Sequence, residues 1–138
     1  MTGNRTLVIC KPDAVERGLA GEILSRLERR GLRLVAAELR QIDRDTAARH
    51  YAEHQGKPFY ADLVDFITSS PSLVLVVEGP EDTWKVVRAV MGPTNPLDAP
   101  PGTIRGDYGL ALTENLVHGS DSPESAAREI EVFFPGLS

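Results

Sequence analysis

The sequence predicts an α+β sandwich in which helices cover one four-stranded antiparallel sheet. Strand-like and helix-like patterns alternate along the chain in the order β-α-β-α-α-β-α-β-α, without an internal repeat or a low-complexity linker. The chain has 138 residues, of which 41% are hydrophobic and 25% charged, as is usual for a globular domain. We therefore expect a single domain over residues 1–138.

The first predicted elements are a strand and an amphipathic helix. Residues 6–10 (TLVIC) form a short apolar run that a Lys-Pro-Asp sequence ends. Leu19, Ile23 and Leu27 then recur at the spacing of one helix face, while charged side chains occupy much of the opposite side. Gly31 is expected to end this helix.

The middle of the chain predicts two further strands separated by two helices. Residues 32–42 form the second strand, residues 43–54 a short helix capped by Asp43, and Pro58 starts a helix that runs to residue 67. Residues 73–77 (LVLVV) are apolar at every position, which is typical of a strand buried on both faces. Periodicity alone also allows a buried helix fragment here, but the flanking prolines and glycine favour a strand.

The last third combines a helix, a long loop, a short strand and a final helix. Pro80 is expected to open a helix that runs to about Met91. Residues 92–113 are dense in Gly and Pro and predict one long irregular segment, which in a small domain is usually functional or disordered. Residues 115–117 predict a strand that leads into HGSDS, where Ser122 caps the final helix.

Composition and charge narrow the possible functions. The net charge of −5 disfavours dedicated nucleic-acid binding, because such proteins use Lys and Arg to neutralise phosphates. No apolar run approaches the roughly 18 to 20 residues that span a bilayer, and the N-terminus lacks the order of a signal peptide, so we expect a cytoplasmic protein without a membrane partner. The single cysteine, Cys10, excludes an internal disulfide and is expected in the core.

His118 is the first candidate for chemistry. It follows a predicted strand and precedes a turn at a helix start, where a side chain can be held rigidly and remain exposed. Imidazole titrates near neutral pH and can form covalent intermediates, so a neutral His118 is able to accept a phosphoryl group. On position alone, a histidine that only hydrogen-bonds the turn is equally compatible with the sequence.

Glu129 is a candidate partner for His118. It falls within the apolar face of the last helix, between Ala126, Ile130 and Phe133. Because a buried carboxylate needs a compensating partner, we expect it to accept a hydrogen bond from His118, which would fix the histidine tautomer and leave the other ring nitrogen free to attack. The alternative is that Glu129 lies at the edge of this face and reaches water.

Three basic residues, Lys11, Arg88 and Arg105, are candidates for binding phosphate. Each alone could equally be a solvated surface charge, and only convergence on His118 would make them an anion site. The segment 92–113 adds small or hydroxylated residues that let the backbone approach phosphate closely: Thr94, Gly102, Thr103 and Gly106. Neither GxxxxGK[ST] nor GxGxxG occurs, so the P-loop and Rossmann phosphate sites are absent.

These motifs together resemble the nucleoside diphosphate kinase family. The resemblance covers nearly the whole chain and is carried by five segments: TLVICKPDAVERGLAGEIL, HYAEHQGKPFY, MGPTNP, PGTIRGDY and NLVHGSDSPESAAREI. It implies a ferredoxin-like α/β sandwich that transfers the γ-phosphate of a nucleoside triphosphate to a nucleoside diphosphate. The transfer would be ping-pong, through phosphorylated His118, with Glu129 bonded to the other ring nitrogen.

The resemblance also implies roles for the remaining site residues. The phosphates would contact Lys11, Tyr51, Arg88, Thr94 and Arg105. The sugar hydroxyls would bond Lys11 and Asn115, while Phe59 and Leu112 would enclose the base without selecting its type. Mg²⁺ would bridge phosphate oxygens with few protein ligands, and Asp121 is a candidate for a water-mediated contact to it.

The resemblance also implies an oligomer, and the sequence allows two functions other than nucleotide phosphorylation to be weighed. The family forms hexamers or tetramers, and Pro96 lies in the loop that joins subunits in hexamers, so the hexamer is favoured. A phosphohistidine carrier would also need an exposed histidine, but not the residues assigned to the nucleotide. An RNA-binding module is a third possibility for this fold, against which the acidic balance and the 6% aromatic content count.

Overall fold

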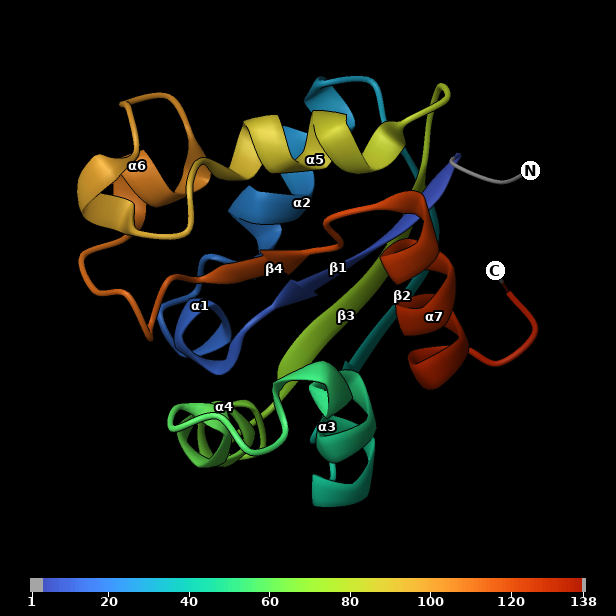
Figure 1. The fold of residues 1–138 in the computed structure, drawn as a ribbon. Helices are drawn as coiled ribbons and strands as arrows, with labels where there is room; N and C mark the ends of the chain where they lie inside the picture. Colours follow the sequence, from blue (N-terminus) through green and yellow to red (C-terminus); the bar gives the residue numbers. More distant parts are fainter. Residues whose placement is uncertain (1–3, 138) are drawn as a thin grey trace.

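A four-stranded antiparallel sheet forms the centre of the protein (Figure 1). The computed structural model describes residues 4–137. The strands lie in the order β2-β3-β1-β4, and every neighbouring pair is antiparallel. Their bounds are β1 Arg5–Cys10, β2 Arg33–Arg40, β3 Ser72–Glu78 and β4 Val117–Gly119. The predicted α+β architecture is thus confirmed.

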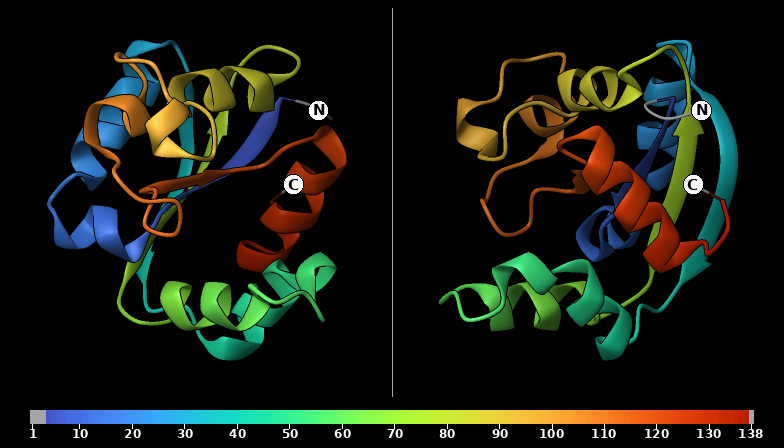
Figure 2. Two further views of the ribbon diagram at one scale, coloured as in Figure 1. Left: turned by 60° about the vertical axis from the view of Figure 1, so that its left-hand side comes forward. Right: turned by 45° about the vertical axis from the view of Figure 1, so that its right-hand side comes forward.

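Helices cover both faces of this sheet (Figures 1 and 2). Their bounds are α1 Pro12–Glu16, α2 Ala20–Arg29, α3 Arg44–His50, α4 Tyr60–Ile67, α5 Thr83–Met91, α6 Ile104–Tyr108 and α7 Pro123–Phe133, with 3₁₀ turns η1 Ala52–His54 and η2 Pro96–Asp98. Helices α2 and α5 pack on one face, and α3, α4 and α7 pack on the other. Within residues 4–137, no helix combines the length and apolar character needed to cross a membrane.

The two central strands are buried on both faces, which explains their continuous apolar sequences. In β1, Val8 and Cys10 point toward α2 and α5, whereas Leu7 and Ile9 point toward α3, α4 and α7. All four side chains are fully buried, and burying an aliphatic side chain of this size contributes about 1.5 to 3 kcal/mol. Cys10 is a core residue as expected, and burial raises the pKa of its thiol to about 12.

Several predicted element ends are confirmed by their hydrogen bonds. The Asp43 side chain accepts from the Thr46 backbone N–H at 3.1 Å, and Ser122 caps α7 by accepting from Ser125 at 3.0 Å. Gly31 follows α2 with φ +105°, a conformation that L side chains rarely adopt. The Asp43 and Ser122 caps fix where α3 and α7 begin, and α7 carries Glu129.

Other predicted boundaries were wrong. Helix α5 begins at Thr83 rather than Pro80, because Asp82 adopts a left-handed conformation at φ +63°. The segment 92–113 is not wholly irregular: it contains η2 and α6, and Thr103 caps α6 by accepting from the Gly106 N–H at 2.9 Å. Helix α1, directly after β1, was not predicted.

The fourth strand differs from its prediction in a way that matters for the site. It spans Val117–Gly119 rather than 115–117, so His118 lies within the strand and not after it. The pairing with β1 sets this register, in which His118 lies opposite Ile9. Gly119 is needed beside it, because a Cβ at this position would come within 2.6 Å of the Met91 sulfur.

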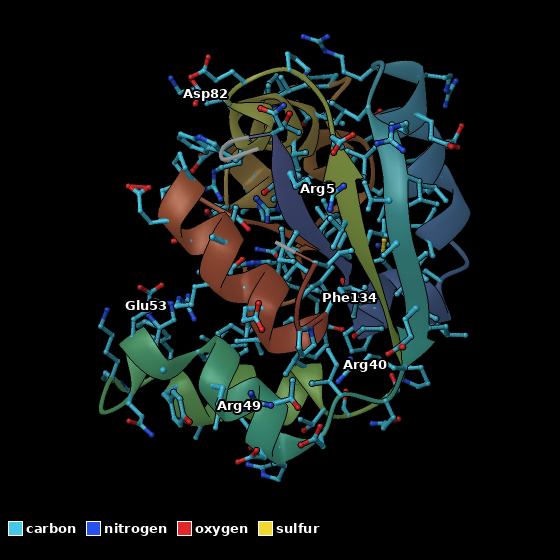
Figure 3. All side chains as sticks on the ribbon, turned by 90° about the vertical axis from the view of Figure 1, so that its right-hand side faces the viewer. Arg5, Arg40, Arg49, Glu53, Asp82 and Phe134 are labelled. Carbon is cyan, nitrogen blue, oxygen red and sulfur yellow. The ribbon has the colours of Figure 1, made fainter. Side chains whose placement is uncertain are left out.

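The C-terminal end of α7 is tied to the sheet by two arginines (Figure 3). Arg40 of β2 donates from Nη1 to the Phe133 carbonyl at 3.3 Å, and Arg5 of β1 donates from Nη1 to the Leu137 carbonyl at 2.8 Å. Figure 3 shows both side chains on the side of the molecule where α7 ends near Phe134. These contacts attach the end of α7, the helix that carries Glu129, and the residues after it to β1 and β2.

Candidate active site

His118 projects from the middle of β4 toward the face covered by α7. Its strand neighbours Val117 and Gly119 are buried on the opposite face, against α5 and the core beneath it, and side chains alternate along a strand. The His118 side chain is 22% exposed, so part of the ring is accessible to a ligand. The sheet therefore supplies the rigidity that a nucleophile requires.

Glu129 is hydrogen-bonded to His118, as the sequence predicted. His118 Nε2 lies 2.9 Å from Glu129 Oε1, and Ser120 Oγ donates to the same oxygen at 2.7 Å. Because an ionised carboxylate only accepts hydrogen bonds, Nε2 must carry a proton, and in the neutral form of the ring Nδ1 therefore holds the lone pair. Within the described residues, Nδ1 makes no hydrogen bond. The neutral ring thus presents an unprotonated nitrogen.

The Glu129 carboxylate stays ionised although it is buried. Burial alone raises the pKa of this carboxyl group. The charge of a protonated His118 and the hydrogen bonds from His118 and Ser120 lower it by more, so that the pKa falls to about 2. Only 6% of the Glu129 side chain is exposed, which excludes the alternative that it reaches water. A fixed negative charge therefore faces Nε2 throughout the neutral pH range.

The three candidate cations converge around the same strand. Arg88 of α5 donates from Nη1 to the Gly119 carbonyl at 3.0 Å, directly beside His118. Arg105 of α6 is buried and donates to three backbone carbonyls, those of Gly92, Asn115 and Val117, at 3.0, 3.1 and 2.6 Å. Lys11 at the end of β1 donates to Asn115 Oδ1 at 2.9 Å. The fold thus brings Lys11, Arg88 and Arg105 to the strand that carries His118, which their spacing in the sequence could not show.

These cations repel one another, as the shifts in their pKa values indicate. Burial, and then the charge of Arg105, lower the pKa of Lys11 to about 8, and Asp13 opposes this shift. Burial, and then the charge of Arg88, lower the pKa of Arg105 to about 10. Like charges held together in this way favour binding of an anion, because the anion relieves their repulsion.

Asn115 joins the long loop to this cluster. Its side chain is buried, accepts from Lys11 Nζ, and donates from Nδ2 to the Thr94 carbonyl at 3.0 Å. Thr94 itself is exposed, so its hydroxyl is accessible. Lys11, Thr94, Arg105 and Asn115 are therefore held in one hydrogen-bonded group.

His50 packs against the rings of both Tyr51 and His118. Tyr51 is 7% exposed, and burial together with the Glu129 charge raises the pKa of its hydroxyl above the ordinary range. The His50 ring is 4.6 Å from the Tyr51 ring and 4.7 Å from the His118 ring, measured between centroids. Sequence reasoning missed His50, although it precedes Tyr51 and is one of only three histidines.

Three further supporting residues were not identified from the sequence. Asp13 accepts from the Leu116 N–H at 3.1 Å, and the Leu116 carbonyl accepts from the Lys11 N–H at 2.9 Å. Leu116 has φ +76°, a strained conformation for a residue with a side chain, immediately before β4. Ser120 orients Glu129. The KPD motif and the HGSD motif contain two of these residues, but only the fold shows what they contact.

No hydrogen bond or ion pair among the described residues joins Phe59, Leu112 or Asp121 to this group. All three are exposed, with Phe59 at 46% and Leu112 at 59%. The Phe59 ring lies 5.4 Å from that of His54. Figures 1 and 2 place α4, which Phe59 precedes, and the segment after α6, which contains Leu112, on the same side of the molecule.

The site offers little for Mg²⁺ apart from Asp121. Among residues 4–137, the one group of three potential metal ligands is His50, His118 and Glu129, which is rich in nitrogen, whereas Mg²⁺ prefers oxygen. Asp121 is an exposed carboxylate three residues after His118. This fits an Mg²⁺ ion that arrives with a nucleotide and takes most of its ligands from phosphate and water.

Comparison with known proteins agrees with this geometry. Residues 4–137 match the family model described as nucleoside diphosphate kinase. A protein of that name from Frankia casuarinae is 58% identical over 138 residues, which is 100% of both chains. Another, from Thermomicrobium roseum, is 60% identical over 130 residues, covering 94% of this chain and 87% of the relative.

Solved structures of the same family have closely similar folds. The nucleoside diphosphate kinase of Halobacterium salinarum in complex with CDP superimposes with a TM-score of 0.92 at 51% identity, over 96% of this chain and 88% of that one. A family protein from Babesia bovis gives a TM-score of 0.92 at 46% identity, over 95% and 88% of the two chains. These likenesses confirm the ferredoxin-like sandwich. They also decide against the phosphohistidine carrier and the RNA-binding module, because the chain belongs to the nucleoside diphosphate kinase family.

Proposed function

We propose that the chain carries out its family's phosphoryl transfer through His118. The observation that carries this proposal is the 2.9 Å contact between His118 Nε2 and Glu129 Oε1, since it places the proton of the neutral ring on Nε2 and leaves Nδ1 free on an accessible side chain. In the first half-reaction, Nδ1 bonds to the γ-phosphorus as the bond from that phosphorus to the β–γ bridging oxygen breaks. The nucleoside diphosphate leaves with the bond's electrons. The second half-reaction reverses these steps with another diphosphate.

Glu129 acts by orienting and stabilising the ring. As Nδ1 forms its bond to phosphorus, positive charge develops on the imidazole, and the carboxylate facing Nε2–H stabilises it. Ser120 holds the carboxylate in place through its 2.7 Å hydrogen bond. Orienting groups of this kind typically contribute about 10² to 10⁴ in rate.

The cations position the phosphates and offset their charge. Arg88, Arg105 and Lys11 lie around the strand that carries His118, and we assign the phosphates to them together with Thr94 and Tyr51. A transferring phosphoryl group spreads its charge over its oxygens, so catalysis depends chiefly on placing charge and on in-line geometry. Mutual repulsion among these cations is relieved when the triphosphate binds.

The nucleoside lies farther from the nucleophile. We assign the sugar hydroxyls to Lys11 and Asn115, and the base to Phe59 and Leu112, whose exposed side chains are free to contact it. Stacking uses only the π-face that every base presents, so this sandwich accepts purines and pyrimidines. When bound with the nucleotide, Mg²⁺ supplies charge neutralisation at the phosphate oxygens, and Asp121 would hold it through water.

The proposed working unit is a homo-oligomer of single-domain chains, residues 1–138, in the cytoplasm. Support comes from two leucines at the loop region, Leu97 and Leu110, which are 76% and 79% exposed. A contiguous exposed apolar patch is typical of a surface on which another subunit packs. Pro96, which begins η2 between Asn95 and Leu97, favours the hexamer over the tetramer through the family's subunit-joining loop.

A label-chase experiment tests this function directly. Protein labelled with [γ-³²P]ATP and freed from nucleotide should lose its label within one turnover when unlabelled GDP or CDP is added, and labelled GTP or CTP should appear. Label that stays on the protein with both diphosphates would contradict phosphoryl transfer to nucleotides. Release as inorganic phosphate alone would contradict it as well, since it would indicate hydrolysis.

A further inference from the structure

His50 has an environment that packing alone does not explain. It ends α3, is 3% exposed, and neither of its ring nitrogens has a hydrogen-bond partner among residues 4–137. Leaving a buried polar group unpaired costs about 1 to 3 kcal/mol. An apolar ring would make the same edge-on contacts with Tyr51, His118 and Phe133 without that cost.

The unpaired nitrogens of His50 lie beside two other potential metal ligands. One ligand atom each of His50, His118 and Glu129 lies within 4.8 Å of the other two. Two imidazoles and a carboxylate form the donor set of many zinc sites that keep an open position, and nitrogen donors favour Zn²⁺ over Mg²⁺. We propose that His50, His118 and Glu129 form a Zn²⁺ site that inactivates the nucleophile.

The required rearrangement is small. Zinc bonds of about 2.0 to 2.2 Å at tetrahedral angles place two ligand atoms roughly 3.4 Å apart. His118 Nε2 and Glu129 Oε1, now 2.9 Å apart, would separate by about 0.5 Å. The remaining separations, at most 4.8 Å, would shorten by up to about 1.4 Å, a shift that a change in the His50 side-chain torsions can provide.

Zinc and phosphate then exclude each other at His118. An ion between Nε2 and Glu129 takes the Nε2 lone pair, so the ring proton moves to Nδ1, which can no longer attack phosphorus. Conversely, His118 phosphorylated on Nδ1 keeps its proton on Nε2 and cannot bind the ion there. This consequence rests on the proposed function, whereas the site itself does not.

Zinc titration in the absence of nucleotide tests the site. The full chain, freed of metal, should bind one Zn²⁺ per chain by calorimetry, and His50→Phe, which keeps an aromatic ring, should weaken binding at least about tenfold. His54→Phe removes the remaining histidine of the chain and should leave zinc affinity unchanged. Equal affinity in His50→Phe and the unmodified protein would overturn the proposal, as would the absence of zinc binding.

Two further measurements distinguish the zinc site itself from its proposed effect on phosphorylation of His118. Anomalous scattering from crystals of the unmodified protein with zinc should place the ion between His50, His118 and Glu129, and zinc found elsewhere would overturn the proposal without any variant. Protein already phosphorylated by ATP should lose its zinc affinity. If zinc binds through His50 but phosphorylated and unphosphorylated chains bind it equally, the proton argument is wrong.

Discussion

Replacing His50 by phenylalanine should change how stability depends on pH. Burial, and then the charge of His118, lower the pKa of His50 to about 3 in the folded protein, whereas a histidine in an unfolded chain titrates near 6.5. The folded state therefore binds fewer protons than the unfolded state as pH falls through 6.5, and this group destabilises the fold progressively below that pH. At neutral pH the effect is small.

The expected magnitude follows from these two pKa values. At pH 5 the pH is about 1.5 units below the pKa of the histidine in the unfolded chain, while folded His50 is still neutral. Keeping His50 neutral therefore lowers the free energy of unfolding by about 2 kcal/mol at this pH. The free energy of unfolding, measured with urea at pH 7.5 and pH 5 in the presence of a chelator, should therefore fall by about 2 kcal/mol less in His50→Phe than in the unmodified protein.

Tyr51→Phe is the matched control for that measurement. It removes a polar atom from the same buried cluster, but Tyr51 does not titrate in this range because its pKa is raised above the ordinary value. The control should therefore keep the full fall in stability between pH 7.5 and pH 5. A fall of the same size in His50→Phe would show that His50 gains its proton in the folded state, and the burial argument would fail.

Three other substitutions test separate parts of the account. Glu129→Gln should lower the rate of phosphorylation by ATP by about 10² to 10⁴ with nearly unchanged ADP affinity, measured by rapid quench and calorimetry; an unchanged rate would remove its proposed role. Phe59→Ala should weaken ADP and CDP binding alike, by about 1 to 3 kcal/mol, and a loss confined to purines would refute the unselective sandwich. Pro96→Ser should lower the melting temperature and the particle size in sizing experiments but not the activity of assembled enzyme, whereas two unchanged values would exclude the loop from assembly.

The sequence predicted best where burial leaves a pattern along the chain. Both central strands are continuous apolar runs because each face of β1 and β3 meets helices, and the caps at Asp43 and Ser122 use side chains that favour those positions. Glu129 was predictable for a related reason. A carboxylate on an apolar helix face needs a partner, and His118 was the nearest candidate in the sequence.

The sequence failed where the structure depends on distant partners. The register of β4 is set by pairing with β1, more than 100 residues away, so His118 was placed after the strand instead of within it. Helix α6 was hidden by the surrounding Gly and Pro, because its start depends on the Thr103 cap. The neighbourhood of His50 could not be predicted either, since three elements, α3, β4 and α7, meet there.

The identity of the nucleophile is the central claim, and labelling of His118→Ala with [γ-³²P]ATP tests it most directly. The unmodified protein should take up label within milliseconds to seconds and lose it in acid, because phosphohistidine is acid-labile and phosphoserine is not. His118→Ala should take up no label while still binding ADP, since Lys11, Arg88 and Arg105 remain in place. Acid-stable label that forms in His118→Ala at the native rate would move the nucleophile to Ser120 or Ser122 and contradict the mechanism.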